Sequence, residues 1–112
     1  MTSREVTDIQ DMQIVNNEAL QRWEAHVNGE TAVADYQRSG DTIVFTHTEV
    51  PTALRGRGIA SRLVQAALDD ARARRLAVVP ACSFVASFIR RNPEYQELVP
   101  RNECARIEQG QG

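Results

Sequence analysis

The stretch EVPTALRGRGIAS, residues 49–61, decides the interpretation of the whole chain. A run rich in β-branched residues, 42–48, leads into it, and a helical pattern follows it directly. The first amides of a helix lack backbone partners and carry partial positive charge from the aligned peptide dipoles. Gly56 and Gly58 let the backbone approach an anion closely, and two arginines add full charges. The stretch therefore predicts a binding site for a diphosphate.

The segment before this loop has the two-residue period of β-strands. Strands are expected over 21–27, 30–37 and 42–48, because apolar and polar residues alternate there. Asn28-Gly29 joins the first two, and both residue types tolerate the positive φ of a two-residue hairpin. Ser39-Gly40-Asp41 is a second turn. The pattern predicts an antiparallel three-strand meander.

The two ends of the chain are less informative. Residues 1–13 show no clean period and are expected to form a loosely ordered segment. Ile14-Val15 could dock on the domain, and Asn16-Asn17-Glu18 is interpreted as a turn. The predicted domain covers 14–100, and 101–112 is expected to be a polar tail.

Helical periodicity begins after the loop. Apolar residues recur at helical spacing over 58–74, and Asp70 is placed to pair with Arg74 one turn later. Leu76–Val79 is a short apolar run, expected to be a strand buried on both faces.

A second helix is predicted near the end of the domain. Ser83 is a favourable N-cap for a helix over 84–91, which Asn92-Pro93 would end. Residues 94–99 fit either a helical turn or an edge strand.

The predicted element order is β-β-β-α-β-α, an α/β (α+β) fold with a mixed sheet. The antiparallel meander excludes a pure Rossmann arrangement, whose glycine fingerprint follows the first strand of a βαβ unit. A P-loop nucleotidase is excluded because the chain lacks Gly-Lys-Ser/Thr.

Composition limits the possible partners. The 112 residues fit one domain. The net charge of −2 argues against nucleic-acid binding, so RNA or nucleotide binding through the arginine loop is poorly supported. No apolar run reaches the ~20 residues of a membrane span, and no secretory signal is recognised, so a cytosolic location is expected. Cys82 and Cys104 lack zinc-site spacing, and a disulfide is not expected in that compartment. All 13 basic residues are arginine.

The loop residues, in this setting, resemble those of a known family. Arg55-Gly56-Arg57-Gly58-Ile59-Ala60 is similar to the Q/R-x-x-G-x-G/A loop of the GNAT acetyltransferases. The preceding meander and the following helix and strand match as well, and the resemblance covers about Trp23 to Leu98. The runs Val79–Val85 and Asn92–Tyr95, with Ile89 between them, are similar to a compact, stand-alone branch of that family.

The resemblance implies a sheet that splays into a V holding the pantetheine arm of acetyl-coenzyme A. It implies backbone contacts to this arm near Glu49 and Val50. The implied binding residues are Val50, Arg55, Gly56, Arg57, Gly58, Ile59, Ala60 and Ser61. Typical members carry helices between their first and second strands, which help to build the acceptor site. Here that space holds only Asn28-Gly29, so an open, small or externally completed acceptor site is expected.

Two residues are candidates for the chemistry. Cys82 precedes a helix N-terminus, where the dipole favours a thiolate, and the resemblance places a suspected active-site cysteine here. It could accept the acetyl group transiently, or be a small buried residue beneath the donor. Glu49 could act as a general base, as a carboxylate near this strand end does in some members, or be a solvated acid.

Other polar residues have weaker claims. Tyr95 could protonate the departing thiolate or fill the base of the sheet. His47 alternates with apolar residues and is expected to be packed, while His26 is expected to be exposed. Arg90-Arg91 could reach the 3′-phosphate of the donor or simply complement the helix dipole.

The resulting prediction is an acetyl-coenzyme A-dependent N-acetyltransferase acting on a small-molecule or protein amine. The alternative is a coenzyme A-binding module with little or no catalysis. No metal is required, no nucleic acid or membrane partner is expected, and the protein is expected to be a monomer or weak dimer.

Overall fold

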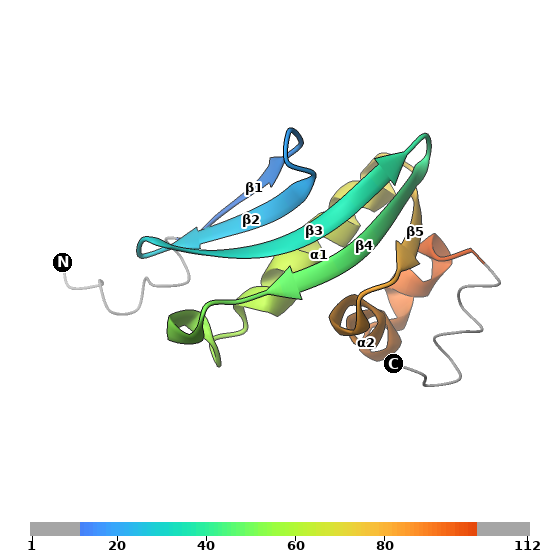
Figure 1. Cartoon of the computed structure of the whole chain (residues 1–112). Coiled ribbons are helices and arrows are strands. Elements are labelled where there is room, and N and C mark those ends of the chain that lie inside the picture. Colours follow the sequence, from blue (N-terminus) through green and yellow to red (C-terminus); the bar gives the residue numbers. More distant parts are fainter. Residues whose placement is uncertain (1–11, 101–112) are drawn as a thin grey trace.

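The computed structural model describes residues 12–100, which form one mixed sheet with helices. The elements are β1 (Gln13–Asn17), β2 (Arg22–Val27), β3 (Glu30–Ser39), β4 (Thr42–Glu49), η2 (Thr52–Leu54), α1 (Ile59–Ala73), β5 (Ala77–Pro80), α2 (Ser83–Arg91) and η3 (Pro93–Leu98). The strand order is β1-β2-β3-β4-β5, with the first four antiparallel and β5 parallel to β4 (Figure 1). The predicted α/β class is confirmed. The predictions for residues 1–11, for the tail 101–112 and for Cys104 lie outside the described residues.

The meander has one strand more than predicted. β1 pairs with β2 from Gln13 opposite His26 to Asn17 opposite Arg22, so the predicted turn at Asn16-Asn17 was wrong. The chain turns instead just after Asn17, whose carbonyl accepts the amide of Leu20. β1 is short and polar because it lies at the sheet edge, where pairing rather than an apolar pattern defines a strand.

The hairpin between β2 and β3 was predicted correctly. Asn28 and Gly29 have φ of 51° and 82°, as a type I′ turn requires. This tight turn leaves no room for helices between the two strands. Because β1 precedes β2, the connection between the first and second strands is the turn at residues 18–21, which holds no helix, rather than the expected Asn28-Gly29.

One face of the sheet packs against the helices. Figure 1 shows α1 behind the sheet, crossing it from the end of β4 to the start of β5. The predicted apolar stripe of α1 is buried, and so are the sheet residues that face it. These core residues are Trp23, Ala25, Val27, Ala32, Ala34, Tyr36, Ile43, Phe45 and Val78 from the strands, with Ile59, Leu63, Val64, Ala67, Leu68 and Ala71 from α1.

The other face, which we call the open face, carries no helix within residues 12–100. The strand register assigns to it Arg22, Glu24, His26, Thr31, Val33, Asp35, His47 and Glu49. In β5, Val78 and Pro80 are buried while Ala77 and Val79 are only half-buried. The expectation that this strand is buried on both faces was therefore wrong, because helices cover only one side.

The C-terminal half corrects two details. Cys82, with extended backbone angles, is the N-cap of α2, and Ser83 is its first residue rather than its cap. α2 ends before Asn92-Pro93, as predicted. Residues 93–98 form a 3₁₀ helix, which settles the alternative left open for this segment. The Asp70–Arg74 pair forms at 2.9 Å.

Candidate functional site

The loop between β4 and α1 has a defined shape. After Pro51 the chain makes one turn of 3₁₀ helix, η2, and Arg55 then folds back so that its Nε donates to the carbonyl of Val50 at 3.2 Å. This bond braces the loop against the end of β4. Arg55 and Arg57 are both exposed.

Two glycines give this loop its turn into α1. Gly56 and Gly58 have φ of 83° and 74°, in the left-handed region where a side chain is disfavoured. Gly58 is the N-cap of α1, and no side chain caps the helix there. The first turn of α1 also contains no acidic residue. The amides of residues 59–61 therefore keep their capacity to bind an anion.

A cavity of about 250 Å³ lies at this helix start. Its lining residues are Val50, Leu54, Arg55, Gly56, Gly58, Ile59, Ala60, Ser61 and Phe84. The structure thus brings together every predicted donor-binding residue except Arg57. Leu54 and Phe84 were missed, because their place in the lining depends on how η2 and the first turn of α2 fold against α1.

The sheet splits next to this cavity. β5 pairs with β4 only from Thr42 opposite Ala77 to Phe45 opposite Pro80. β4 continues to Glu49, so its last four residues have no β5 partner. The diverging ends of parallel strands form the predicted V. We call this opening, between the last residues of β4 and the start of α2, the gap.

Cys82 and Thr48 meet across the gap. The Cys82 thiol is buried, with a residue exposure of 9%, and its Sγ donates to Thr48 Oγ1 at 3.4 Å. Thr48 pairs with Ala34 and therefore points to the helix side of the sheet. Sequence reasoning missed Thr48, because the two residues are 34 positions apart and the contact depends on the tertiary fold.

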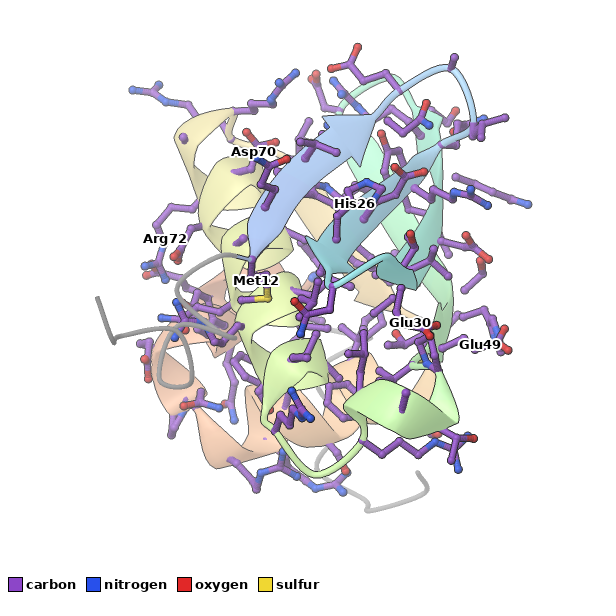
Figure 2. The ribbon with its side chains drawn as sticks, turned by 90° about the vertical axis from the view of Figure 1, so that its left-hand side faces the viewer. Met12, His26, Glu30, Glu49, Asp70 and Arg72 are labelled. Atoms are coloured by element: carbon purple, nitrogen blue, oxygen red, sulfur yellow. The ribbon has the colours of Figure 1, made fainter. Side chains whose placement is uncertain are left out.

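Glu49 lies on the opposite side of β4 from this contact. It pairs with Val33 on the open face, and its side chain is 70% exposed. Its carboxylate is 3.4 Å from Nε2 of His47, which is 58% exposed. Figure 2 shows Glu49 directed away from α1. The structure therefore does not join Glu49 and Cys82, and the expectation that His47 is packed was wrong because its strand face is uncovered.

The open face also holds a buried carboxylate. Glu24 is only 7% exposed, and it accepts hydrogen bonds from Arg22 at 2.8 Å, Asn17 at 3.0 Å and His26 at 3.0 Å. The Arg22 guanidinium, opposed by burial and helped by Asn17 and His26, holds the pKa of Glu24 below its usual value. His26 is 44% exposed, as expected, and its Nδ1 lies 3.1 Å from the Thr31 hydroxyl.

Tyr95 fills the base of the fold. It is 4% exposed, donates to Asp69 of α1 at 2.7 Å and packs against Phe88. Burial, with this bond to a carboxylate, raises the pKa of Tyr95. These contacts favour a structural role for Tyr95 over the alternative role of protonating the departing thiolate. Arg90 donates to Ser87 within α2.

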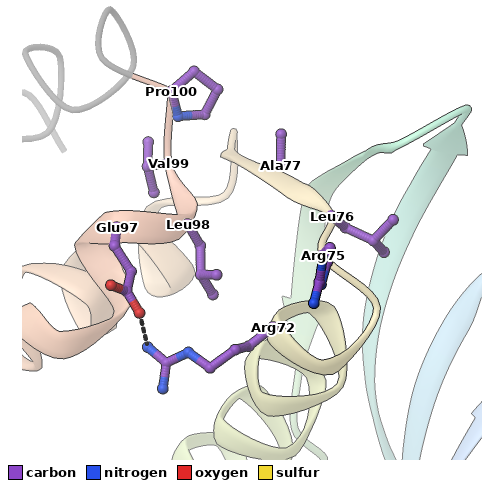
Figure 3. A pocket seen from close by; sticks show the side chains of 8 residues that line it. All are labelled: Arg72, Arg75, Leu76, Ala77, Glu97, Leu98, Val99 and Pro100. Atoms are coloured by element: carbon purple, nitrogen blue, oxygen red, sulfur yellow. Dashed lines mark ion pairs between the residues drawn. The ribbon is translucent and has the colours of Figure 1, made fainter.

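A larger cavity, about 470 Å³, lies at the opposite end of α1 and is shown in Figure 3. Arg72, which lines this cavity, already has protein partners. It pairs with Glu97 at 3.1 Å, donates a hydrogen bond to the carbonyl of Glu94 and lies over the Tyr95 ring. The cavity is therefore a weaker candidate than the loop. Within the described residues, no cluster of three or more His, Cys, Asp or Glu could hold a metal ion. Residues 12–100 also contain no helix with the length and apolarity to cross a bilayer.

Comparison with known proteins agrees with this geometry. The profile of the GCN5-related N-acetyltransferase family matches residues 22–98, more than half of the chain. The chain belongs to this family. It is also similar to Protein NATD1 of Gallus gallus and of Bos taurus, each 36% identical over 90 residues, which cover 78% of this chain and 82% and 80% of those proteins. Protein NATD1 of Homo sapiens is 34% identical over 90 residues, with 78% and 80% coverage. The family match begins at β2 and ends at η3, so it contains the loop, the gap and Cys82.

Proposed function

We propose that the protein transfers an acetyl group from acetyl-coenzyme A to an amine. The observation that carries this proposal is the uncapped start of α1, which faces a cavity beside the unpaired end of β4. Membership of an acetyltransferase family supports it. Acetyl-coenzyme A would supply a thioester-activated acetyl group.

The loop and α1 would hold the diphosphate. The amides of residues 59–61 point out of an uncapped helix start, and the glycines keep the approach clear of Cβ atoms. Arg55 and Arg57 add positive charge beside it. The cavity of about 250 Å³ is smaller than most ligand sites, so it would enclose only the diphosphate and its neighbouring atoms.

The unpaired end of β4 would hold the pantetheine arm. Backbone groups of residues 46–49 have no β5 partner, so they can bind an extended arm as a neighbouring strand would. The thioester would then lie in the gap, close to Thr48 and Cys82. Phe84, at the start of α2, closes the apolar side of the cavity.

Glu49 would accept the proton that the attacking amine loses. Its exposed carboxylate and the neighbouring His47 can release that proton to solvent. Cys82 offers a second route: its thiolate attacks the thioester carbonyl, the coenzyme A thiolate leaves, and the amine then displaces the Cys82 sulfur. Both routes end with the acetyl group on the amine and the coenzyme protonated.

Calorimetry with coenzyme A tests the donor site. Gly58→Glu places bulk and negative charge at the start of α1 and should lower affinity at least about tenfold, a loss of ~1.4 kcal/mol. Gly40→Glu is the matched control, because Gly40 also has positive φ, 56°, with open space for a Cβ, but lies in the β3–β4 turn. Unchanged affinity in Gly58→Glu would refute this placement of the diphosphate.

Labelled acetyl-coenzyme A distinguishes the two routes. The chain contains no lysine, so a stable side-chain label would have to be on sulfur or oxygen. Label on Cys82 under single-turnover conditions, and its loss with turnover in Cys82→Ala, supports the covalent route. Turnover that survives Cys82→Ala without any label leaves direct transfer.

The alternative, a coenzyme A-binding module, is favoured by the burial of the Cys82 thiol and its separation from Glu49. It predicts coenzyme binding without acetyl transfer to any amine or peptide tested. Location in the cytosol stays a prediction.

A further inference from the structure

The open face is the side from which an acceptor can reach the gap. The loop cavity, α1 and α2 occupy the helix side, and Cys82 and Thr48 meet there. On the opposite side, Val33 is only half-buried and His47 and Glu49 are exposed. A donor seated from the helix side would therefore meet its acceptor across the open face.

The charges on this face are unevenly matched. Arg22 is the single arginine or lysine among the open-face residues defined above. Its guanidinium forms an ion pair with Glu24 at 2.8 Å. Asp35 lies opposite Arg22 on β2 and His47 on β4 but has no cationic partner within the described residues. Glu49 has only the imidazole of His47 at 3.4 Å. The face therefore presents two carboxylates whose charge no arginine offsets.

The shape of this face suits a chain rather than a small molecule. Neither the cavity at the start of α1 nor the one at its opposite end includes Asp35, His47 or Glu49. Strands lie ~4.8 Å apart and rise ~3.3 Å per residue, so the area between Arg22, His26 and Glu49 measures roughly 13 by 10 Å. That length matches about four residues of an extended polypeptide.

We propose that the open face, from β2 to the end of β4, docks an extended, lysine-bearing cationic segment of another protein. The carboxylates of Asp35 and Glu49 attract its charges, and one of its lysine amines lies at the gap. Naming a lysine as the acetyl acceptor rests on the proposed function, whereas the docking itself does not. Among the described residues no helix covers this surface, which leaves it accessible.

Binding of a defined peptide tests the docking directly. The probe is a fluorescein-labelled glycine–serine peptide of about ten residues that carries four lysines, measured by anisotropy, with a glutamate-for-lysine peptide beside it. We expect binding of the lysine peptide alone, weakened as salt is raised. Equal binding of the glutamate peptide, or no binding of either, would overturn the proposal.

Two double variants locate the site. Asp35→Asn with Glu49→Gln should weaken lysine-peptide binding about tenfold, from ~0.7 kcal/mol for each of the two charges. Asp41→Asn with Glu97→Gln changes the net charge equally but lies elsewhere, and should change binding less than about twofold. An equal effect of both variants would show a general charge effect and overturn the proposal. Thermal unfolding of each variant confirms that it is folded.

Other occupants give distinct outcomes. A dimer in light scattering that dissociates in the Asp35→Asn/Glu49→Gln variant would assign the face to a second copy of the chain and overturn the proposal. Displacement of the peptide by spermidine at equal concentration would assign the site to a small polyamine and overturn it as well. Coenzyme binding without peptide binding refutes the docking alone, and peptide binding without coenzyme binding refutes the proposed function alone.

Discussion

Replacement of Glu24 by Gln should reveal how strongly its buried carboxylate stabilises the sheet. Gln keeps the shape of the side chain but removes the charge that Arg22, Asn17 and His26 all donate to. Hydrogen bonds to a charged group contribute ~1.5–3 kcal/mol each. Arg22 and His26 are 36% and 44% exposed, so solvent weakens their share. We expect Glu24→Gln to lower the free energy of unfolding by about 2–3 kcal/mol at neutral pH.

The pH dependence of this loss identifies its cause. The pKa of Glu24 is lowered in the folded protein from an unfolded value near 4.5. Its contribution is therefore fully present above the unfolded pKa and is lost as the pH falls through the lowered folded pKa. Gln does not titrate, so the difference between wild type and variant should shrink in strong acid.

Urea unfolding followed by circular dichroism, at neutral and acidic pH, measures both effects. Glu97→Gln is the matched control, because Glu97 also pairs with an arginine but is 70% exposed. Its loss should stay below about 0.5 kcal/mol. A Glu24→Gln loss as small as the control, or one that does not change with pH, would refute the assignment of this stability to the buried carboxylate.

Two further results should follow from the core. Leu63→Ala, at a fully buried site on α1, should lower the free energy of unfolding by about 2–5 kcal/mol in urea, and a loss below 1 kcal/mol would contradict tight packing of α1 on the sheet. Burial raises the pKa of Tyr36 and Tyr95 above 10.0, so in the folded protein both should form phenolate only above that pH, and stability should fall as the pH rises further. Absorbance titration with and without urea measures the folded and unfolded pKa values. Coincident titration curves would contradict the prediction.

The elements that local chemistry determines could be predicted from the sequence. The Asn28-Gly29 hairpin, the stripe of α1 and the glycine loop depend on residues adjacent in the chain or one helical turn apart. Eight of the cavity's nine lining residues come from residues 50 and 54–61, because a helix start and its loop are contiguous. All of these except Leu54 were predicted.

The rest depends on contacts between distant segments. β1 was missed because a polar edge strand is defined by its partner rather than by its own pattern. Burial of Glu24 could not be predicted, since it requires donors from β1 and β2 that the register brings together. His47 was misplaced because alternation assigns a residue to a face but does not say whether that face is covered.

The short pairing of β4 with β5 has a consequence for solubility as well as for binding. The last four residues of β4 pair with β3 but have no partner on the β5 side, where their backbone donors and acceptors can be joined by another extended chain. A donor arm lying along them would act as the missing strand, so saturation with coenzyme would also protect the protein from edge-to-edge association. On the proposed function, the backbone groups that would bind the donor are the ones that, without it, would be open to edge-to-edge association.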